Sequence, residues 1–278
     1  MDKAVPESNK APLFYIAIIS HGHAEALLEN THLLDLARQP SVRLVIVDNL
    51  VESPLQAFCT LHEIDYLHRD GPSRGFGSNN NLAFAFFDRR YRLSSSDYFI
   101  CCNPDVVVDS TNWSRLQETL SGRLIQLSAI NLFTDPALTV QDPSIRHFMG
   151  ISDYVKMLLG EKNPAGIDRS AMCEPVHCDW AAGSFLIFAV DLYRALKGFD
   201  ERYFMYFEDA DICLRAWRLA GVRVCYLPEV RAYHRGGLLN RNIFSRHFYW
   251  YVKSMLRYFL RLYLGGRIPS REQYELKR

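Results

Sequence analysis

Short apolar runs alternate with amphipathic segments along the first hundred residues. Runs rich in β-branched and aromatic residues predict strands at Leu13–Ser20, Val42–Asp48, Ile64–His68 and Tyr98–Cys102. Between them, apolar residues recur at helical spacing and predict helices at Glu25–Arg38, Leu55–His62 and Asn79–Tyr91. This alternation specifies an α/β domain with a Rossmann-like, mostly parallel central sheet flanked by helices.

The second half of the chain is less regular. Further strands are predicted at Leu124–Phe133, Ser184–Val190 and Val222–Leu227, and a helix is predicted to run as far as Ala220. The stretch 134–175 mixes charges, prolines and glycines, and we interpret it as an irregular insertion beside the functional site. We therefore predict one catalytic domain at residues 11–238 and a helical C-terminal segment at residues 239–278.

Composition narrows the class of protein. A net charge of +1 over 278 residues gives the chain no electrostatic reason to bind nucleic acid. No apolar run reaches the length of about 18 residues that a membrane-spanning helix requires. The polar N-terminus lacks a secretory pattern, and the seven scattered cysteines suit free thiols, so we expect the protein in the cytoplasm.

Polar residues follow the predicted strands. Ser20 and His21 end the first strand, and Asp48 and Asn49 end the second. Ligands gather where the strands of such sheets end. A carboxylate beside an amide can recognise a nucleobase edge or ribose hydroxyls, although the same pair can also cap a turn.

A glycine-rich loop, residues 71–81, joins the third strand to a helix and contains Gly75 and Asn80. Its backbone N–H groups could face a phosphate, and a tight turn with an Asn-rich helix cap is the alternative. It is not a dinucleotide fingerprint, because the third glycine is missing and the loop follows the third strand.

Asn103 and Asp105 follow the fourth strand, where an oxygen ligand could hold a cation that bridges two phosphates. Mg²⁺ or Mn²⁺ suits such a site, because these ions need only one or two protein ligands when phosphate and water complete the shell. His234 could supply a nitrogen ligand or a hydrogen bond to the diphosphate. The alternatives are a plain turn and a structural histidine.

Glu208, Asp209 and Asp211 crowd beside aromatic residues at a helix entry. Neighbouring carboxylates raise one another's proton affinity, which suits a general base. Helix capping by acids explains one or two of these residues without any catalytic role.

Together these motifs resemble family 2 glycosyltransferases with the GT-A fold, over Leu13 to His234. Four motifs look like the branch that adds L-rhamnose to GlcNAc-diphosphate-polyprenol in O-antigen assembly: Gly75-Phe76-Gly77-x-Asn79-Asn80-Asn81, Asn103-Pro104-Asp105, Trp180-Ala181-Ala182-Gly183-Ser184, and Gly198-Phe199-Asp200 continuing to Asp211.

The resemblance implies roles for individual residues. Asp48 and Asn49 would contact the base and ribose of the donor, dTDP-rhamnose, beside the Ser20–His23 loop. Asp105 and His234 would hold the cation, with Asn103 in place of the first acid of the family's Asp-x-Asp motif. Asp209, beside Glu208, would be the catalytic base of an inverting reaction. Trp180 and Gly183 would meet the acceptor.

Two other functions remain open from the sequence alone. The first is transfer from another nucleotide sugar, such as UDP-galactose or UDP-GlcNAc, and the second is sugar-nucleotide binding without catalysis. The sequence sets neither the linkage position nor the preferred metal, and a homo-oligomer is possible.

The C-terminal segment 241–264 has helical periodicity. Phe244, Phe248, Tyr251, Met255, Phe259 and Leu262 are predicted on one face, with Arg246, Lys253, Arg257 and Arg261 opposite. Such a helix can lie on the anionic inner face of the cell membrane, where a polyprenyl-linked acceptor would be found. The alternative is a helix docked on the catalytic domain or on a dimer partner. The whole interpretation also requires that Asp105 and Asp209 converge near a common cavity.

Overall fold

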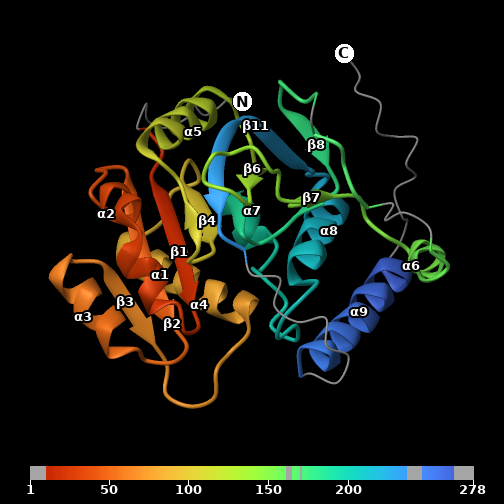
Figure 1. Ribbon diagram of the computed structural model, residues 1–278, viewed down its shortest axis with the longest axis horizontal. Coiled ribbons are helices and arrows are strands. Elements are labelled where there is room, and N and C mark those ends of the chain that lie inside the picture. The colour runs from red at the N-terminus through yellow and green to blue at the C-terminus, as the bar shows by residue number, and fades with distance from the viewer. Residues whose placement is uncertain (1–10, 161–164, 170, 237–245, 266–278) are drawn as a thin grey trace, which may run out of the picture.

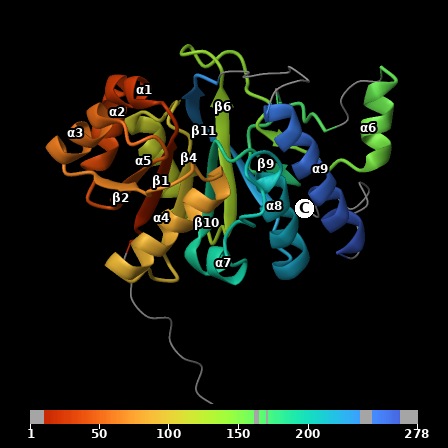
Figure 2. The ribbon, with the colours of Figure 1, turned by 90° about the horizontal axis from the view of Figure 1, so that it is seen from below.

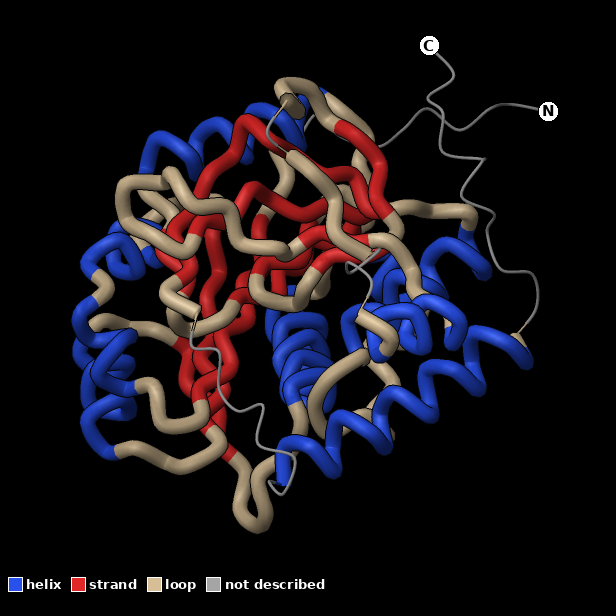
Figure 3. The backbone as a smooth tube through the Cα atoms, turned by 45° about the vertical axis from the view of Figure 1, so that its right-hand side comes forward, coloured by secondary structure: helices blue, strands red, loops and turns tan. Residues whose placement is uncertain are grey.

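The computed structural model describes residues 11–160, 165–169, 171–236 and 246–265. A twisted sheet runs through the centre of this part of the chain, with helices on both of its sides (Figure 1, Figure 3). The last helix lies along one edge of the molecule rather than over the middle of the sheet (Figure 3).

The first half of the chain builds a parallel sheet. Its strands lie in the order β3 (Asp65–His68), β2 (Val42–Asp48), β1 (Phe14–Ser20) and β4 (Tyr98–Cys102). The connecting helices are α1 (Ala24–Glu29), α2 (Thr31–Ala37), α3 (Ser53–Leu61) and α4 (Phe76–Tyr91). Parallel neighbours need such crossovers, so the predicted strand–helix alternation is confirmed.

The second half makes the sheet mixed. Strand β10 (Phe185–Ala189) lies antiparallel between β4 and β6 (Leu127–Phe133). The order continues through β11 (Val224–His234), parallel to β6, to the short β5 (Val106–Val107), and β8 (Val176–Cys178) also pairs with β11. A separate ribbon joins β7 (Ile145–Arg146) to β9 (Trp180–Ala181). The remaining helices are α5 (Ser110–Gly122), α6 (Ile151–Leu158), α7 (Val190–Ala195), α8 (Glu208–Ala220) and α9 (Arg246–Leu264).

Two apolar cores lie on opposite faces of the sheet. Alternate residues of β1 divide between them: Ile16 and Ile18 contact the core of α1, α2, α3 and α5, whereas Tyr15 and Ala17 contact that of α4, α7 and α8. This division follows from the two-residue period of a strand. Because both faces are covered, β1 is apolar along almost its whole length.

Three predicted elements differ from the structure. The helix predicted at Glu25–Arg38 is broken at Asn30, whose side chain accepts a hydrogen bond from Leu33 N and starts α2. Helix α4 begins at Phe76, inside the predicted loop. The insertion 134–175 contains β7 and α6, so it is more ordered than its composition predicts.

Helix α9 packs on the domain that precedes it. Tyr258, Phe259 and Leu262 share a small core with Tyr203 and Leu214. Figure 2 shows α9 between α8 and α6, and the rings of Tyr154 and Phe259 meet at 5.3 Å between centroids. The inner face of α9 is therefore docked on the catalytic domain, which is the alternative that the sequence left open.

The basic side chains of α9 depart from their predicted arrangement. Arg246 and Lys253 are exposed. Arg261 instead pairs with Asp211 and Asp200, each at 2.6 Å, and the guanidinium of Arg257 lies 5.6 Å from the centre of the Tyr203 ring. The prediction that all four basic residues lie opposite the packed face is thus wrong for Arg257 and Arg261. Phe244 lies outside the described residues.

The outer face of α9 carries a row of exposed apolar side chains beside Lys253. Its exposed side chains include Tyr249, Leu256, Leu260 and Tyr263, and exposed apolar residues continue on and beside α6 at Ile151, Val155 and Leu159. The hydroxyl of Tyr263 accepts a hydrogen bond from Ile151 N at 2.8 Å, so the two helices are joined at this point.

Among the described residues, no helix combines the length and the hydropathy that crossing a bilayer would need. The seven cysteines are free thiols, and all but Cys173 are buried. Free buried thiols agree with the pattern expected from their scattered positions.

Candidate functional site

Three parallel strands end side by side and bring the predicted donor residues to one edge of the sheet. Ser20 and Asp48 are paired in the register of β1 and β2, and Asn103 follows β4 directly. We call this cluster, made of Ser20, Asp48, Asn49, Tyr66 and Asn79, the donor-side edge. Convergence of this kind is expected where parallel strands share a direction.

The carboxylate of Asp48 is almost fully buried and is surrounded by hydrogen-bond donors. Its oxygens accept hydrogen bonds from Leu50 N at 2.9 Å, Glu52 N at 2.7 Å and the Tyr66 hydroxyl at 2.9 Å. Ser20 Oγ in turn donates to Glu52, whereas His21 is exposed and donates its backbone N–H to His23. Asp48 therefore holds the turn after β2, and direct contact with a nucleotide stays a prediction.

Asn49 links the strand end to the glycine-rich loop. Its Oδ1 accepts from Arg74 N at 3.2 Å and from Asn79 Nδ2 at 3.0 Å, while its Nδ2 donates to Arg74 O. The Asn80 side chain is fully buried and its Oδ1 has no hydrogen-bond partner, although its Nδ2 donates to Phe76 O. A buried acceptor without a partner is costly and marks a place where a ligand could bind.

Gly75 has a packing role. A β-carbon at this position would lie 2.1 Å from the backbone oxygen of Phe204. The loop is thus pressed against the segment that leads into α8. Close approach of two backbones explains this glycine without a phosphate.

Asp105 and His234 meet at the far side of Asn103. His234 Nε2 lies 3.4 Å from Asp105 Oδ1 and 3.4 Å from Asn103 Nδ2. The other ring nitrogen, Nδ1, lies 2.5 Å from Asp142 Oδ2. A carboxylate that holds the second nitrogen fixes the ring so that Nε2 points at Asp105.

Charge shapes the pKa values in this group. Burial alone would lower the pKa of His234, but its hydrogen bonds to Asp105 and Asp142 outweigh burial and raise the pKa to about 9. Burial opposes ionisation of Asp105, yet the hydrogen bond and charge of His234 leave the pKa of this carboxyl below its ordinary value. Asp105 is therefore an anion, as a cation ligand must be.

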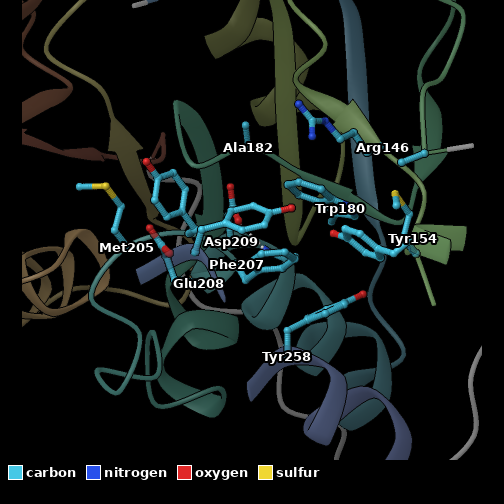
Figure 4. A pocket seen from close by; sticks show the side chains of 14 residues that line it. Arg146, Tyr154, Trp180, Ala182, Met205, Phe207, Glu208, Asp209 and Tyr258 are labelled. Carbon is cyan, nitrogen blue, oxygen red and sulfur yellow. Dashed lines mark hydrogen bonds between the residues drawn. The ribbon is translucent and has the colours of Figure 1, made fainter. Parts of the chain in front are cut away.

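A pocket of about 280 Å³ opens beside the N-terminus of α8 (Figure 4). Its lining includes Glu208 and Asp209 at one end and Arg146 and Trp180 at the other. Helix α6 adds Tyr154, and α9 adds Tyr258. Asp105 and Asp48 do not line this pocket. Asp209 lines this pocket and Asp105 does not, so the expected convergence of the two carboxylates near one cavity stays a prediction.

A short series of hydrogen bonds joins Asp209 to the end of β4. Gly183 N donates to Asp209 Oδ2 at 3.2 Å, and the next residue, Ser184, accepts from Asn103 N through its carbonyl at 2.8 Å. Residues 183–184 therefore link Asp209 to Asn103, which follows β4 and lies two residues before Asp105. Gly183 packs on Phe76, whose ring would be 2.8 Å from an added β-carbon.

Of the two acids at the start of α8, Glu208 is buried and Asp209 is half-buried. Burial raises the pKa of Glu208 to about 8, with a smaller contribution from the charge of Asp209. Burial also raises the pKa of Asp209, against hydrogen bonds from Ala210 N and Gly183 N and the charge of Arg146. Glu208 Oε2 has no hydrogen-bond partner. The crowding predicted from sequence is present, but burial is the larger cause.

The backbone that precedes these acids is strained. Tyr206 and Phe207 have φ values of 70° and 64°, which side chains other than glycine rarely adopt. Each such residue costs on the order of 1–3 kcal/mol and persists where surrounding structure enforces it. Here the strain aims Glu208 and Asp209 into the pocket.

Sequence reasoning missed several residues of the site. Asp142 and Arg146 come from the insertion 134–175, and Tyr154, Tyr251 and Tyr258 come from α6 and α9. The signal for this part of the site is the density of aromatic residues in 241–264, which indicates an aromatic pocket wall better than the basic residues of the same segment do. Trp180 lines the pocket as the acceptor prediction requires, and its contact with an acceptor stays a prediction.

Comparison with known proteins gives two kinds of relative. No family model matches the sequence. The chain is similar to rhamnosyltransferase WbbL of Escherichia coli K12, with 34% identity over 253 residues that cover 90% of this chain and 93% of the relative. It is also similar to the N-acetylglucosaminyl-diphospho-decaprenol L-rhamnosyltransferase of Mycobacterium tuberculosis H37Rv, with 28% identity over 76% of this chain and 71% of that protein.

Solved structures show the same fold at lower identity. A mannosyltransferase from Pyrobaculum calidifontis, solved with GDP-Man and Mn²⁺, superposes with a TM-score of 0.57 at 14% identity and covers 95% of this chain and 68% of its own. Together with the sheet order and the helices on both faces, this likeness confirms the predicted GT-A fold.

Proposed function

The chain belongs to the rhamnosyltransferase family of GT-A glycosyltransferases, and on this premise we propose that it transfers L-rhamnose from dTDP-β-L-rhamnose to a GlcNAc-diphosphate-polyprenol acceptor. The mycobacterial relative is named for a sugar-diphosphate-decaprenol acceptor, which supports this class of acceptor. The observation that carries the proposal is the position of Asp209. Its carboxylate lines the pocket and accepts a hydrogen bond from Gly183 N, and the next residue, Ser184, accepts one from Asn103 N at the end of β4.

The residues at the end of β4 fit a divalent cation. Asp105 Oδ1 and His234 Nε2 lie 3.4 Å apart, and Asp142 orients the ring. One carboxylate and one imidazole suit Mn²⁺ or Mg²⁺ when phosphate oxygens and water fill the other positions. Because His234 has a pKa of about 9, the ring would release its Nε2 proton as the cation binds. Asp105 and His234 would hold the cation, which would neutralise charge on the departing diphosphate. The mannosyltransferase of the same fold was solved with Mn²⁺.

Asp209 would act as the general base. Its carboxylate accepts the proton of the acceptor hydroxyl while that oxygen bonds to the anomeric carbon of the donor. The bond from this carbon to the diphosphate oxygen breaks on the opposite face, so the anomeric configuration inverts. The Gly183 and Ala210 N–H groups fix the orientation of the carboxylate.

Glu208 complements this base. With a pKa of about 8 it carries a proton at neutral pH, and its partnerless oxygen lines the same pocket. A neutral carboxyl can donate a hydrogen bond to the acceptor sugar without repelling Asp209. Glu208 therefore orients the acceptor in this account.

Thermal unfolding with a panel of nucleotide sugars tests the donor. We expect dTDP-rhamnose with Mn²⁺ to raise the melting temperature more than UDP-galactose or UDP-GlcNAc. At equal concentration, the nucleotide sugar that binds the folded protein most tightly stabilises it most. A larger shift with a UDP-sugar would reject rhamnose as the donor. Equal, negligible shifts with all of them would reject sugar-nucleotide binding itself.

We further propose that α9 and α6 hold the enzyme on the inner face of the cell membrane, where a polyprenyl acceptor lies. The support is the exposed apolar row Tyr249, Leu256, Leu260 and Tyr263. Burying a leucine side chain contributes about 1.5–3 kcal/mol. The exposed Lys253 and Arg246 beside this row would each add about 1 kcal/mol on an anionic surface.

Flotation with phosphatidylglycerol vesicles tests this attachment. The double variant Leu256→Ser, Leu260→Ser should float less than the unchanged chain. Leu124→Ser is the matched control, since Leu124 is 95% exposed on the loop before β6, away from α9. Equal flotation of the double variant would reject the membrane surface, and loss of a dimer on gel filtration would assign the row to a second copy.

A further inference from the structure

The pocket beside Asp209 is chemically divided. Its lining combines the carboxyl groups of Glu208 and Asp209, the side chains of Met149, Tyr154, Tyr251 and Tyr258, and Arg146, which lies near Trp180 in Figure 4. Arg146 is close enough to both Asp209 and Tyr154 for its charge to act on the pKa of each. Among the described residues that line it, Arg146 is the one cation. This charge acts on Asp209, and no contact with a ligand has yet been assigned to it.

Arg146 is held in place from two directions. Its Nε donates to Pro143 O at 2.9 Å, and its guanidinium lies 5.3 Å from the centre of the Trp180 ring. The two residues are register partners in β7 and β9, and Trp180 Nε1 donates to His147 O at 3.1 Å. The plane of the guanidinium is therefore fixed before any ligand binds.

This geometry selects a kind of ligand. The fork of an arginine matches the oxygens of a phosphate, and stacking on an aromatic ring reduces the entropy lost on binding. The charge of Arg146 reaches Asp209, where it opposes the rise in pKa. A ligand that places a hydroxyl at Asp209 and also carries an anionic group could therefore place that group at Arg146.

The wall beyond Arg146 takes apolar groups. Tyr258 is buried, and Tyr154 and Tyr251 are half-buried, so rings and methionine carbons dominate this side. From there α6 and α9 lead to their exposed apolar faces. A ligand that satisfies all three parts is a sugar, then a phosphate group, then a hydrocarbon chain.

We propose that Arg146 binds the diphosphate that joins the acceptor sugar to its lipid, and that Tyr154, Tyr251 and Tyr258 enclose the first carbon atoms of that lipid. This assignment rests on the proposed function, because it takes Asp209 as the group that meets the acceptor hydroxyl. Arg146 then sets the preference for diphosphate-linked acceptors over neutral glycosides.

The test compares two acceptors that carry the same sugar. One is GlcNAc-diphosphate-farnesol, and the other is octyl β-N-acetylglucosaminide, which has an apolar tail and no charge. In Arg146→Gln the ratio of kcat/KM values, diphosphate over glycoside, should fall about 10- to 100-fold, chiefly through KM. Any effect that Arg146 exerts through Asp209 changes both acceptors alike and cancels in the ratio.

Two variants control this result. Arg115→Gln removes a cation of α5 that donates to Glu229 O at 2.9 Å, and the ratio should not change. Arg146→Lys keeps the charge without the fork and should give an intermediate ratio. An unchanged ratio in Arg146→Gln would overturn the proposal.

A binding measurement covers the remaining outcomes. Farnesyl diphosphate, added with saturating dTDP to occupy the donor side, should quench tryptophan fluorescence and bind about 10- to 100-fold more weakly to Arg146→Gln. Equal affinity for both chains would overturn the assignment. If this difference is found while neither acceptor is glycosylated, the proposed function fails and the diphosphate site stands. If Arg146→Gln does not fold, Arg146→Lys replaces it in both assays.

Discussion

The donor-side edge and the pocket beside Asp209 differ in how their polar groups are paired. We call the second region the acceptor pocket, because the acceptor is proposed to bind there. At the donor-side edge Asp48 accepts three hydrogen bonds and Asn49 takes part in three, all from the chain itself. In the acceptor pocket Glu208 Oε2 has no partner, and burial raises the pKa of both Glu208 and Asp209. The polar side chains of the first region are thus paired within the chain, whereas a buried carboxyl oxygen of the second has no partner there.

This difference separates residues that position from residues that react. A satisfied polar network is rigid and contributes stability, whereas buried groups without partners cost stability and are retained where a ligand needs them. Substitutions in the two regions should therefore change different quantities. Those at the donor-side edge should act on the free energy of unfolding, and those in the site should act on turnover.

The largest effect outside the pocket is expected at the cation ligands. Asp105→Asn removes the anionic oxygen that lies 3.4 Å from His234 Nε2. Loss of several kcal/mol of charge stabilisation should lower kcat about 10³-fold. Initial rates over a Mn²⁺ titration measure this loss. Full activity of Asp105→Asn at ordinary Mn²⁺ concentration would contradict the account.

Glu208 should show how much a buried carboxyl without a hydrogen-bond partner lowers the free energy of unfolding. Its pKa is about 8 in the folded chain against 4.5 when exposed, so folding stability is lost as pH rises from about 4.5 through 8. Glu208→Gln should remove this loss and stabilise the protein at pH 9 by on the order of 3 kcal/mol. Urea unfolding of both chains at pH 5 and pH 9 measures it, with the gain confined to the higher pH and turnover reduced at both.

Asp142 tests whether the histidine is oriented from behind. Asp142→Asn keeps the shape of the partner at His234 Nδ1 and removes its charge. Apparent affinity for Mn²⁺ should weaken about 10- to 100-fold, while kcat at saturating Mn²⁺ changes little. A lower kcat with unchanged affinity for Mn²⁺ would assign Asp142 a different role.

The smallest effect is expected at the donor-side edge. Tyr66→Phe deletes the hydroxyl that donates to the buried Asp48, and should cost about 1–2 kcal/mol of unfolding free energy with kcat unchanged. Tyr91→Phe is the comparison, since its hydroxyl donates to the more exposed Asp65 and its loss should cost less. If Tyr66→Phe lowers kcat without loss of stability, the edge is not a scaffold.

The local pattern of the sequence was enough for the four parallel strands of the first half, but not for the antiparallel direction of β10 or for the short strands β5 and β8. Strands β2 and β4 begin and end where their apolar runs do, because a strand covered on both faces needs an unbroken run. The order of polar residues after strands also brought Ser20, Asp48 and Asn103 to one edge. The start of α4 was missed because Gly75 and Gly77 suggest a loop, whereas both make room for neighbouring segments, Phe204 and Phe199.

Contacts between distant segments could not be predicted. Asp142 and Arg146 belong to an insertion without periodicity, and they reach the site only through pairing with β9 and through His234. In the same way, Arg261 faces the domain because Asp211 and Asp200 are there, which helical periodicity cannot reveal. Partner choice of this kind is a property of the folded chain.

The most direct measurement compares two properties of Asp209→Asn. The amide keeps the size of the side chain and can still accept from Gly183 N, but it cannot take a proton. We expect transfer of rhamnose to fall by about 10²- to 10⁴-fold, with the affinity for dTDP-rhamnose and Mn²⁺ unchanged. Transfer at the rate of the unchanged chain would show that Asp209 is not the base, and the account of this pocket would be wrong.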